Sequence, residues 1–238
     1  MTMIAANLHH VRSRIVTACA AADRDPAGVQ LLAVSKTFPA EAVREALAAG
    51  QTAFGENYVQ EGVAKIEALA DVRAQLVWHC IGPLQSNKTR VVAEHFDWVH
   101  SIDRLKIAER LSDQRPDGLP PLQVCLQVNV DGGANKAGVP ADAVLALAQA
   151  VASLPRLQLR GLMAIPEPAP DFDAQKALFL RARVVYEQIR DSGIALDTLS
   201  LGMSADLEAA VAAGSTMVRV GTAIFGGRPG PEEPRRAL

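Results

Sequence analysis

Eight short apolar runs alternate with alanine-rich, helix-forming segments along the chain. The expected strands are residues 31–35, 52–54, 76–81, 98–101, 122–130, 157–165, 196–201 and 215–220. The expected helices between them are residues 39–49, 57–70, 87–95, 103–114, 140–153, 171–191 and 204–213. A further amphipathic helix comes first, and its apolar face is formed by Ile4, Leu8, Val11, Ile15 and Cys19. This alternation restricts the chain to α/β folds with a parallel sheet.

Two α/β architectures fit eight strand–helix units, namely a doubly wound sheet and a closed (β/α)8 barrel. A dinucleotide-binding sheet would carry Gly-x-Gly-x-x-Gly after its first strand, but this strand ends in Ser35-Lys36-Thr37-Phe38-Pro39. The count of eight therefore favours a single TIM barrel over residues 1–227, because no linker divides them. The Gly- and Pro-rich residues 228–238 predict a flexible tail.

Several helix ends are marked in the sequence. Gly50 and Gly214 predict the C′ positions that close two helices. Asp103 and Ser204 predict N-caps, and Pro140 predicts a first helical turn.

Charge and cysteine spacing exclude several classes of protein. A net charge of -2 and a pI of about 6.2 are not those of a nucleic-acid-binding surface. Cys19, Cys80 and Cys125 are far apart and lack zinc-site spacing, which suits a reducing compartment. No leader-like start and no eighteen-residue apolar run is present, so we expect a cytoplasmic protein that does not bind membranes.

The first strand ends in a lysine. A lysine amine held at the end of a buried strand loses hydration, which lowers its pKa toward a nucleophilic range. Lys36 is therefore a candidate for Schiff-base chemistry, although a lysine that extends from the strand end into water explains this stretch equally well.

The last two units each place a glycine before a helix start, in Gly202-Met203-Ser204 and Gly221-Thr222. Glycine allows close approach of the backbone, and helix starts attract anions. Phosphate sites in barrels are often built from the loops after strands seven and eight, so this pair favours a phosphate. The alternatives are a plain N-cap at Ser204 and an ordinary turn at Gly221-Thr222.

Three further polar residues lie on or after strands. Arg219 interrupts an apolar strand, where it either forms an internal ion pair, with Glu56 or Asp131 as candidate partners, or donates to a ligand. Asn57 either caps a helix or contacts the ligand. His79 is either a core histidine with one hydrogen bond or a ligand contact. The histidines show no metal-site spacing, so we expect no metal.

The chain resembles the YggS-type (PROSC-like) pyridoxal phosphate homeostasis proteins over nearly its whole length. The resemblance rests on Ala33-Val34-Ser35-Lys36, Phe54-Gly55-Glu56-Asn57-Tyr58, Trp78-His79-Cys80-Ile81-Gly82-Pro83-Leu84-Gln85-Ser86-Asn87-Lys88, Gly161-Leu162-Met163, Leu201-Gly202-Met203-Ser204 and Val218-Arg219-Val220-Gly221-Thr222-Ala223-Ile224-Phe225-Gly226. It implies an alanine-racemase-like barrel (PLP fold type III) without the C-terminal β domain. The loop 131–138, with Lys136, lacks an acidic residue that the family often has, and we expect Lys136 to face water.

The resemblance also implies pyridoxal 5′-phosphate (PLP) bound covalently to Lys36 as an internal aldimine. Ser204, Gly221 and Thr222 would hold its phosphate, and Arg219 would face its ring nitrogen. The expected cofactor-binding set is Lys36, Asn57, His79, Met203, Ser204, Arg219, Gly221 and Thr222, with no catalytic residue.

The leading hypothesis is a non-enzymatic, monomeric PLP-binding protein that maintains PLP homeostasis and supplies apo-enzymes. Racemisation needs a second acid or base. The resemblance to alanine racemases implies that this group is a tyrosine on the separate β domain. The only tyrosines of this sequence are Tyr58 and Tyr186. The alternatives are an amino-acid racemase with another base and a class I aldolase whose Schiff base forms with the substrate.

Overall fold

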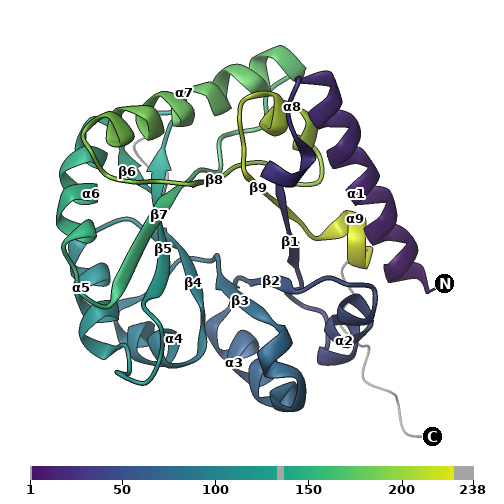
Figure 1. Ribbon diagram of the computed structural model, residues 1–238, viewed down its shortest axis with the longest axis horizontal. Coiled ribbons are helices and arrows are strands. Elements are labelled where there is room, and N and C mark those ends of the chain that lie inside the picture. The colour runs from purple at the N-terminus through teal and green to yellow at the C-terminus, as the bar shows by residue number, and fades with distance from the viewer. Residues whose placement is uncertain (1, 133–136, 228–238) are drawn as a thin grey trace, which may run out of the picture.

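The chain forms a closed barrel of parallel strands surrounded by helices (Figure 1), in a computed structural model that describes residues 2–132 and 137–227. The strands are β1 (Gln30–Val34), β2 (Ala53–Glu56), β3 (Val77–Cys80), β4 (Trp98–Ile102), β5 (Leu122–Asn129), β6 (Val139–Pro140), β7 (Leu157–Met163), β8 (Thr198–Ser200) and β9 (Met217–Val220). The α-helices of the described residues are α1 (Met3–Ala21), α2 (Ala40–Ala48), α3 (Val59–Ala68), α4 (Thr89–His95), α5 (Leu105–Gln114), α6 (Val144–Ala152), α7 (Phe172–Asp191), α8 (Leu207–Ala212) and α9 (Thr222–Phe225).

The barrel is closed by two pairings, between β4 and β5 and between β1 and β9. In the second of these, Gln30 pairs with Met217 and Ala33 with Val220, so the first strand lies beside the last. The strand order confirms the predicted (β/α)8 barrel. The short strand β6 was not predicted; it pairs with β5 and does not take part in closing the barrel.

Helix α1 covers the side where the barrel's first and last units meet. It packs beside α8 and α9, as Figure 1 shows on the right of the view. Asn7 on α1 donates a hydrogen bond from Nδ2 to the carbonyl of Ile224, at 2.8 Å. The predicted apolar face is confirmed, because Ile4, Leu8, Val11 and Ile15 are all buried. The amino-terminal helix therefore stabilises the junction between the first and last units of the barrel.

Most of the apolar core lies between the strands and the helices, whereas the barrel interior is partly polar. Leu32, Ala53 and Met217 form a small apolar cluster inside the barrel. Since side chains alternate along a strand, Leu32 and Met217 identify the inward-facing rows of β1 and β9. These rows lead toward the carboxyl ends of the strands, where barrel proteins carry their functional sites.

The helix ends were predicted with mixed success. Gly50 and Gly214 follow α2 and α8 with φ angles of 81° and 99°, which confirms both as C′ glycines. Asp103 and Ser204 are not N-caps, because α5 begins at Leu105 and α8 at Leu207. Pro140 belongs to β6 rather than to a first turn of α6. The predictions for Lys136 and for the tail 228–238 fall outside the described residues.

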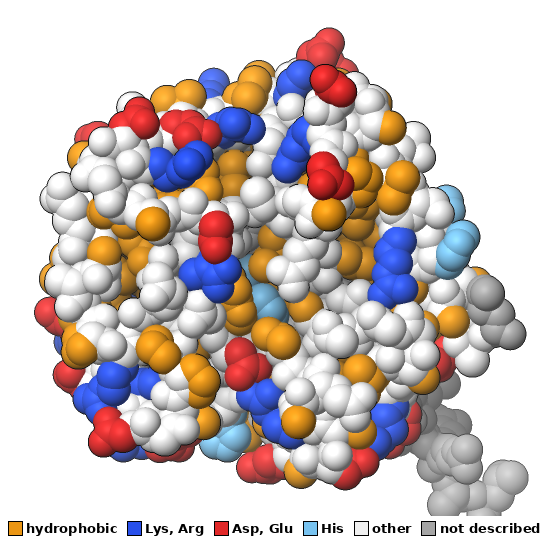
Figure 2. Space-filling view, viewed as in Figure 1, with side chains coloured by type: hydrophobic (Ala, Val, Ile, Leu, Met, Phe, Trp, Pro, Cys, Tyr) orange, Lys and Arg blue, Asp and Glu red, His pale blue; other side chains and the backbone are white. Residues whose placement is uncertain are grey.

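The surface is mixed in charge. Figure 2 shows basic and acidic side chains interspersed on the face it presents, without a continuous field of one sign. Within the described residues, no helix combines the length and the apolar character needed to cross a bilayer.

Candidate functional site

Lys36 lies two residues beyond the end of β1, on the inward-facing row that also contains Leu32 and Val34. On the neighbouring strand, the corresponding row runs from Met217 through Arg219 to Gly221. Leu32 is paired with Arg219, so both rows end at the same level of the barrel mouth. The strand register therefore brings Lys36 close to the turn after β9.

A pocket of about 250 Å³ opens at this point, small enough to suit a ligand with a single ring. It is lined by Val34, Lys36, Phe38, Met203, Ser204, Ala205, Gly221, Thr222 and Gly226. Five of the eight predicted site residues are thus brought together. They come from the turns after β1, β8 and β9.

Two glycine turns lie at this pocket: Gly221 lines it, and Gly202 precedes Met203 and Ser204, which line it. A Cβ on Gly221 would lie 3.1 Å from the carbonyl oxygen of Val34, so the turn after β9 packs tightly on β1. Gly202 has a φ of 90°, and a Cβ there would collide with the Cβ of Ala210. Helix α9 begins at Thr222, and the N–H groups of a first turn lack intrahelical acceptors. This backbone suits an anion such as a phosphate group.

Arg219 lies below the pocket, inside the barrel, and is only 4% exposed. Its Nη1 donates to the carbonyl and the Oγ of Ser200, at 2.7 and 2.8 Å, and its Nη2 donates to the carbonyl of Ala164 at 3.1 Å. Burial lowers the pKa of Arg219 to about 10, so the guanidinium still carries its charge at neutral pH. It forms no ion pair within the described residues, and Glu56 pairs with Lys65 instead.

His79 lies in the barrel interior rather than among the residues that line the pocket. Its Nδ1 lies 2.9 Å from Nε2 of His100, whose Nδ1 lies 3.1 Å from Oγ of Ser200. A hydrogen-bonded chain thus connects His79 to Arg219. His79 also stacks on Trp98, and its buried Nε2 has no partner. Its contact with a cofactor remains a prediction.

Burial of the two histidines predicts a distinct pH dependence of stability. Burial lowers the pKa of His79 from 6.5 to about 3 and places that of His100 well below 6.5. Between pH 6.5 and 3 these two histidines bind more protons in the unfolded chain than in the folded one, so their contribution to the free energy of unfolding falls as the pH drops. We expect the His79→Gln variant to lose about 1.4 kcal/mol per pH unit of this slope in urea titrations.

The matched control for this measurement is His9→Gln, on the exposed side of α1. This variant should retain the slope of the unmodified protein. An unchanged slope in His79→Gln would contradict the assignment of a neutral, buried histidine.

Asn57 follows β2 and faces the same end of the barrel. It does not cap α3, since that helix begins at Val59 with Tyr58 as its N-cap. Its Oδ1 is buried and has no hydrogen-bond partner. A Cβ on Gly82 would collide with the Asn57 carbonyl, so the two turns are in close contact. A buried acceptor without a partner is costly, and this one favours a ligand contact over a purely structural role.

Some residues of the site were not identified from the sequence. Phe38 lines the pocket and stacks on Phe225, with ring centroids 5.2 Å apart. Lys65 lies behind the Lys36 turn, and its Nζ donates hydrogen bonds to Glu56 and Glu61. The i, i+4 spacing of Glu61 and Lys65 was the only available signal, and it is typical of any solvated helix.

A larger groove in the described structure does not contain Lys36. This groove, of about 530 Å³, lies outside the barrel between α1, α7 and α8, and Arg14 in it donates a hydrogen bond to the carbonyl of Ser204 at 3.0 Å. The arginine that lines it, Arg14, is paired with Glu208 at 2.8 Å. Among residues 2–132 and 137–227, no group of histidine, cysteine and carboxylate side chains could hold a metal ion.

Comparison with known proteins first defines the class. The family described as "Alanine racemase, N-terminal domain" matches residues 6–229. An alanine racemase from Corynebacterium glutamicum shares the fold at a TM-score of 0.65 and 20% identity, with 98% of this chain covering 63% of that one. The closed barrel with its strand-end lysine is thus an alanine-racemase-type barrel.

Closer relatives define the family within this class. The pyridoxal phosphate homeostasis protein of Pseudomonas aeruginosa is 61% identical over 96% of this chain and 97% of its own. The structure of PipY from Synechococcus elongatus with PLP bound has a TM-score of 0.83 and 41% identity, over 94% of this chain and all of that one. The chain belongs to the pyridoxal phosphate homeostasis protein family.

Proposed function

We propose that this protein binds PLP covalently through Lys36 and keeps the cofactor available without a catalytic cycle of its own. PLP supplies an aldehyde that condenses with a primary amine and releases water. The single observation that carries the proposal is the pocket that joins Lys36 to the two glycine turns, at Ser204 and at Gly221-Thr222. The PLP-bound structure of PipY, a relative of similar length, supports it.

The residues present suit each part of this cofactor. The first turn of α9 and the turn at Ser204 would hold the phosphate, because backbone N–H groups and the helix start favour an anion. Arg219 remains charged at neutral pH, so it can only donate a hydrogen bond. We place it facing the ring nitrogen, which it would keep unprotonated. Asn57 offers a buried acceptor that lacks a partner.

The site supports cofactor storage better than turnover. Racemisation requires an acid or base on the opposite side of the cofactor from the lysine. Neither tyrosine lines the pocket: Tyr58 is 57% exposed, and the hydroxyl of Tyr186 donates to the carbonyl of Leu196 on the outside of the barrel. The relatives are named homeostasis proteins, which is consistent with this proposal. Its corollaries are delivery of PLP to apo-enzymes, a monomeric state and a cytoplasmic location.

Three measurements test the proposal directly. The purified protein should be yellow, and it should restore the activity of an apo-enzyme that depends on PLP, measured against free cofactor. Incubation with single L-amino acids should give no sustained change in optical rotation. Sustained racemisation would favour the racemase alternative, and a colourless protein that traps sugar phosphates would favour an aldolase.

A negative charge placed in the turns at Ser204 and Gly221-Thr222, here called the anion cradle, tests the phosphate assignment. The Thr222→Glu variant should bind PLP at least about tenfold more weakly, because a carboxylate at the start of α9 repels the phosphate. Its affinity for pyridoxal, which lacks the phosphate, should change little. The ratio of the two affinities, measured by absorbance titration, is the internal control. Equal losses of affinity for both compounds would show that this turn does not bind the phosphate.

A further inference from the structure

The peptide bonds on both sides of Lys36 are held by side chains of a single, partly buried network. The carbonyl of Ser35, which precedes Lys36, accepts a hydrogen bond from Lys65 Nζ at 2.7 Å. The N–H of Thr37, which follows Lys36, donates to Glu61 Oε1 at 2.5 Å. The backbone at Lys36 is thus fixed from both directions.

Lys65 joins these two contacts. Besides the Ser35 carbonyl, its ammonium donates to Glu56 Oε1 at 2.8 Å and to Glu61 Oε1 at 2.6 Å. An ammonium has three donors, and all three are used. Ser35 Oγ donates to the same Glu56 oxygen at 2.5 Å, so both the main chain and the side chain of Ser35 belong to the network.

This arrangement is costly, which points to a role beyond packing. Lys65 and Glu56 are 6% and 1% exposed, and Glu56 Oε2 is buried without a partner. Burial raises the pKa of Glu56 against the opposing effect of Lys65. A buried ion pair is often no more stabilising than apolar residues of the same volume.

The backbone at Thr37 is also strained. Its φ is 68°, a left-handed conformation that is unfavourable for a β-branched residue. Such strain persists only where the surroundings enforce it, and it gathers at functional positions. Here the enforcing contact is the hydrogen bond from Thr37 to Glu61, directly beside the lysine of the site.

We propose that Lys65 and Glu61 are positioning residues that hold the turn around Lys36 so that its amine enters the cofactor pocket. This inference rests on the proposed function, since it assigns the network to the same lysine. Lys65 and Glu61 act through the backbone of residues 35–37 and do not themselves line the pocket.

The decisive comparison is Glu61→Ala against Glu61→Gln. Glu61 is partly exposed, so neither change should unfold the protein. Removing the acceptor in Glu61→Ala should speed amide exchange at Thr37 in cofactor-free protein about tenfold and PLP release by a similar factor. Glu61→Gln keeps an oxygen that can accept from Thr37, so both rates should stay within about twofold of the unmodified protein.

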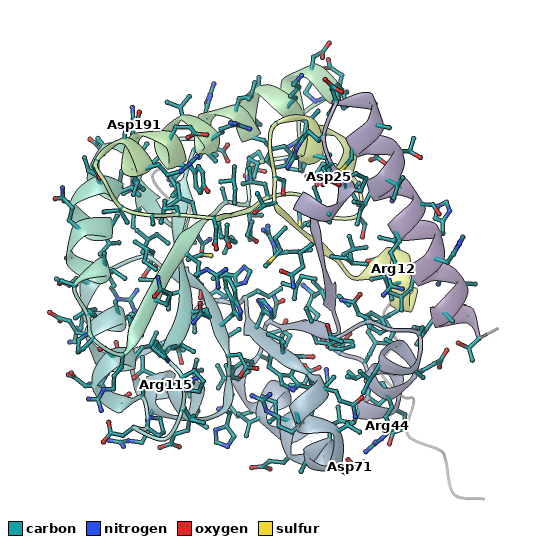
Figure 3. All side chains as sticks on the ribbon, viewed as in Figure 1. Arg12, Asp25, Arg44, Asp71, Arg115 and Asp191 are labelled. Atoms are coloured by element: carbon teal, nitrogen blue, oxygen red, sulfur yellow. The ribbon has the colours of Figure 1, made fainter. Side chains whose placement is uncertain are left out.

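A second variant tests Lys65 itself. Lys65→Met should weaken the absorbance band of the lysine-bound cofactor and speed PLP release, whereas its circular dichroism should stay native. The control is Arg44→Ala, which breaks the exposed Arg44–Asp71 pair, where α2 meets the 3₁₀ segment Ala70–Gln75 (Figure 3). The control should match the unmodified protein in absorbance and in release.

The outcomes separate this inference from the proposed function. If the unmodified protein binds PLP on Lys36 but Glu61→Ala leaves both Thr37 exchange and PLP release unchanged, the positioning role is wrong. If Thr37 exchange responds to Glu61→Ala as expected but the unmodified protein takes up no PLP, the network holds the turn and the proposed function is wrong.

Discussion

Lys36→Ala is expected to abolish covalent cofactor binding completely. Lys36 is the one lysine that lines the pocket formed by the turns after β1, β8 and β9 in the described structure. Alanine has no amine to condense with an aldehyde. Lys65, in the network behind the Lys36 turn, cannot replace Lys36, because its amine is used for three hydrogen bonds. The variant should therefore be colourless after dialysis, and borohydride treatment should leave no cofactor mass on the chain.

The control for this experiment is Lys106→Ala, which removes an exposed lysine on α5. It should remain yellow and should carry one cofactor after reduction. If Lys36→Ala retains a borohydride-stable adduct on another lysine, the assignment of Lys36 is wrong. If it retains cofactor that dialysis removes slowly, the anion cradle alone binds PLP.

Gly161→Ala should produce the largest loss of stability among single glycine replacements in the strands. Gly161 lies on β7, paired with Cys125 on one side and Thr198 on the other. A Cβ at this position would overlap the carbonyl group of Thr198, which is backbone and cannot rotate away. Separating β7 from β8 to make room should lower the free energy of unfolding by about 3 kcal/mol or more.

Equilibrium unfolding in urea measures this loss, with Gly118→Ala as the matched control. A Cβ on Gly118 would meet no atom within 4 Å, and the residue has no positive φ angle. Its free energy of unfolding should change by less than about 0.5 kcal/mol. If the Gly161→Ala variant is as stable as the Gly118→Ala control, the strands β7 and β8 can accommodate a Cβ at residue 161 and the expected clash with Thr198 is wrong.

The fold could be predicted from the sequence because hydrophobic alternation acts locally and repeats. Each of the eight barrel strands is a short apolar run, and burial on both faces in a parallel barrel preserves that pattern. The helix starts were less predictable. Asp103 and Ser204 are common N-cap types, but α5 and α8 begin two or three residues later. The two-residue strand β6 carries too short a pattern to be detected.

The candidate site was predictable where it follows from strand ends. Lys36, Ser204 and Gly221 were each found because polar or glycine residues recur where strands finish, and the barrel brings those ends together. The hydrogen-bonded chain from His79 to Arg219 could not be found in this way. It depends on which inward rows face each other across the barrel, and this depends on the strand register.

The pairing of residue 30 with residue 217 has a consequence for protein synthesis. A ribosome releases the lysine turn long before the neighbouring wall of the pocket, which contains Gly221 and Thr222. A nascent chain that lacks Gly221 and Thr222 therefore has no assembled pocket around Lys36.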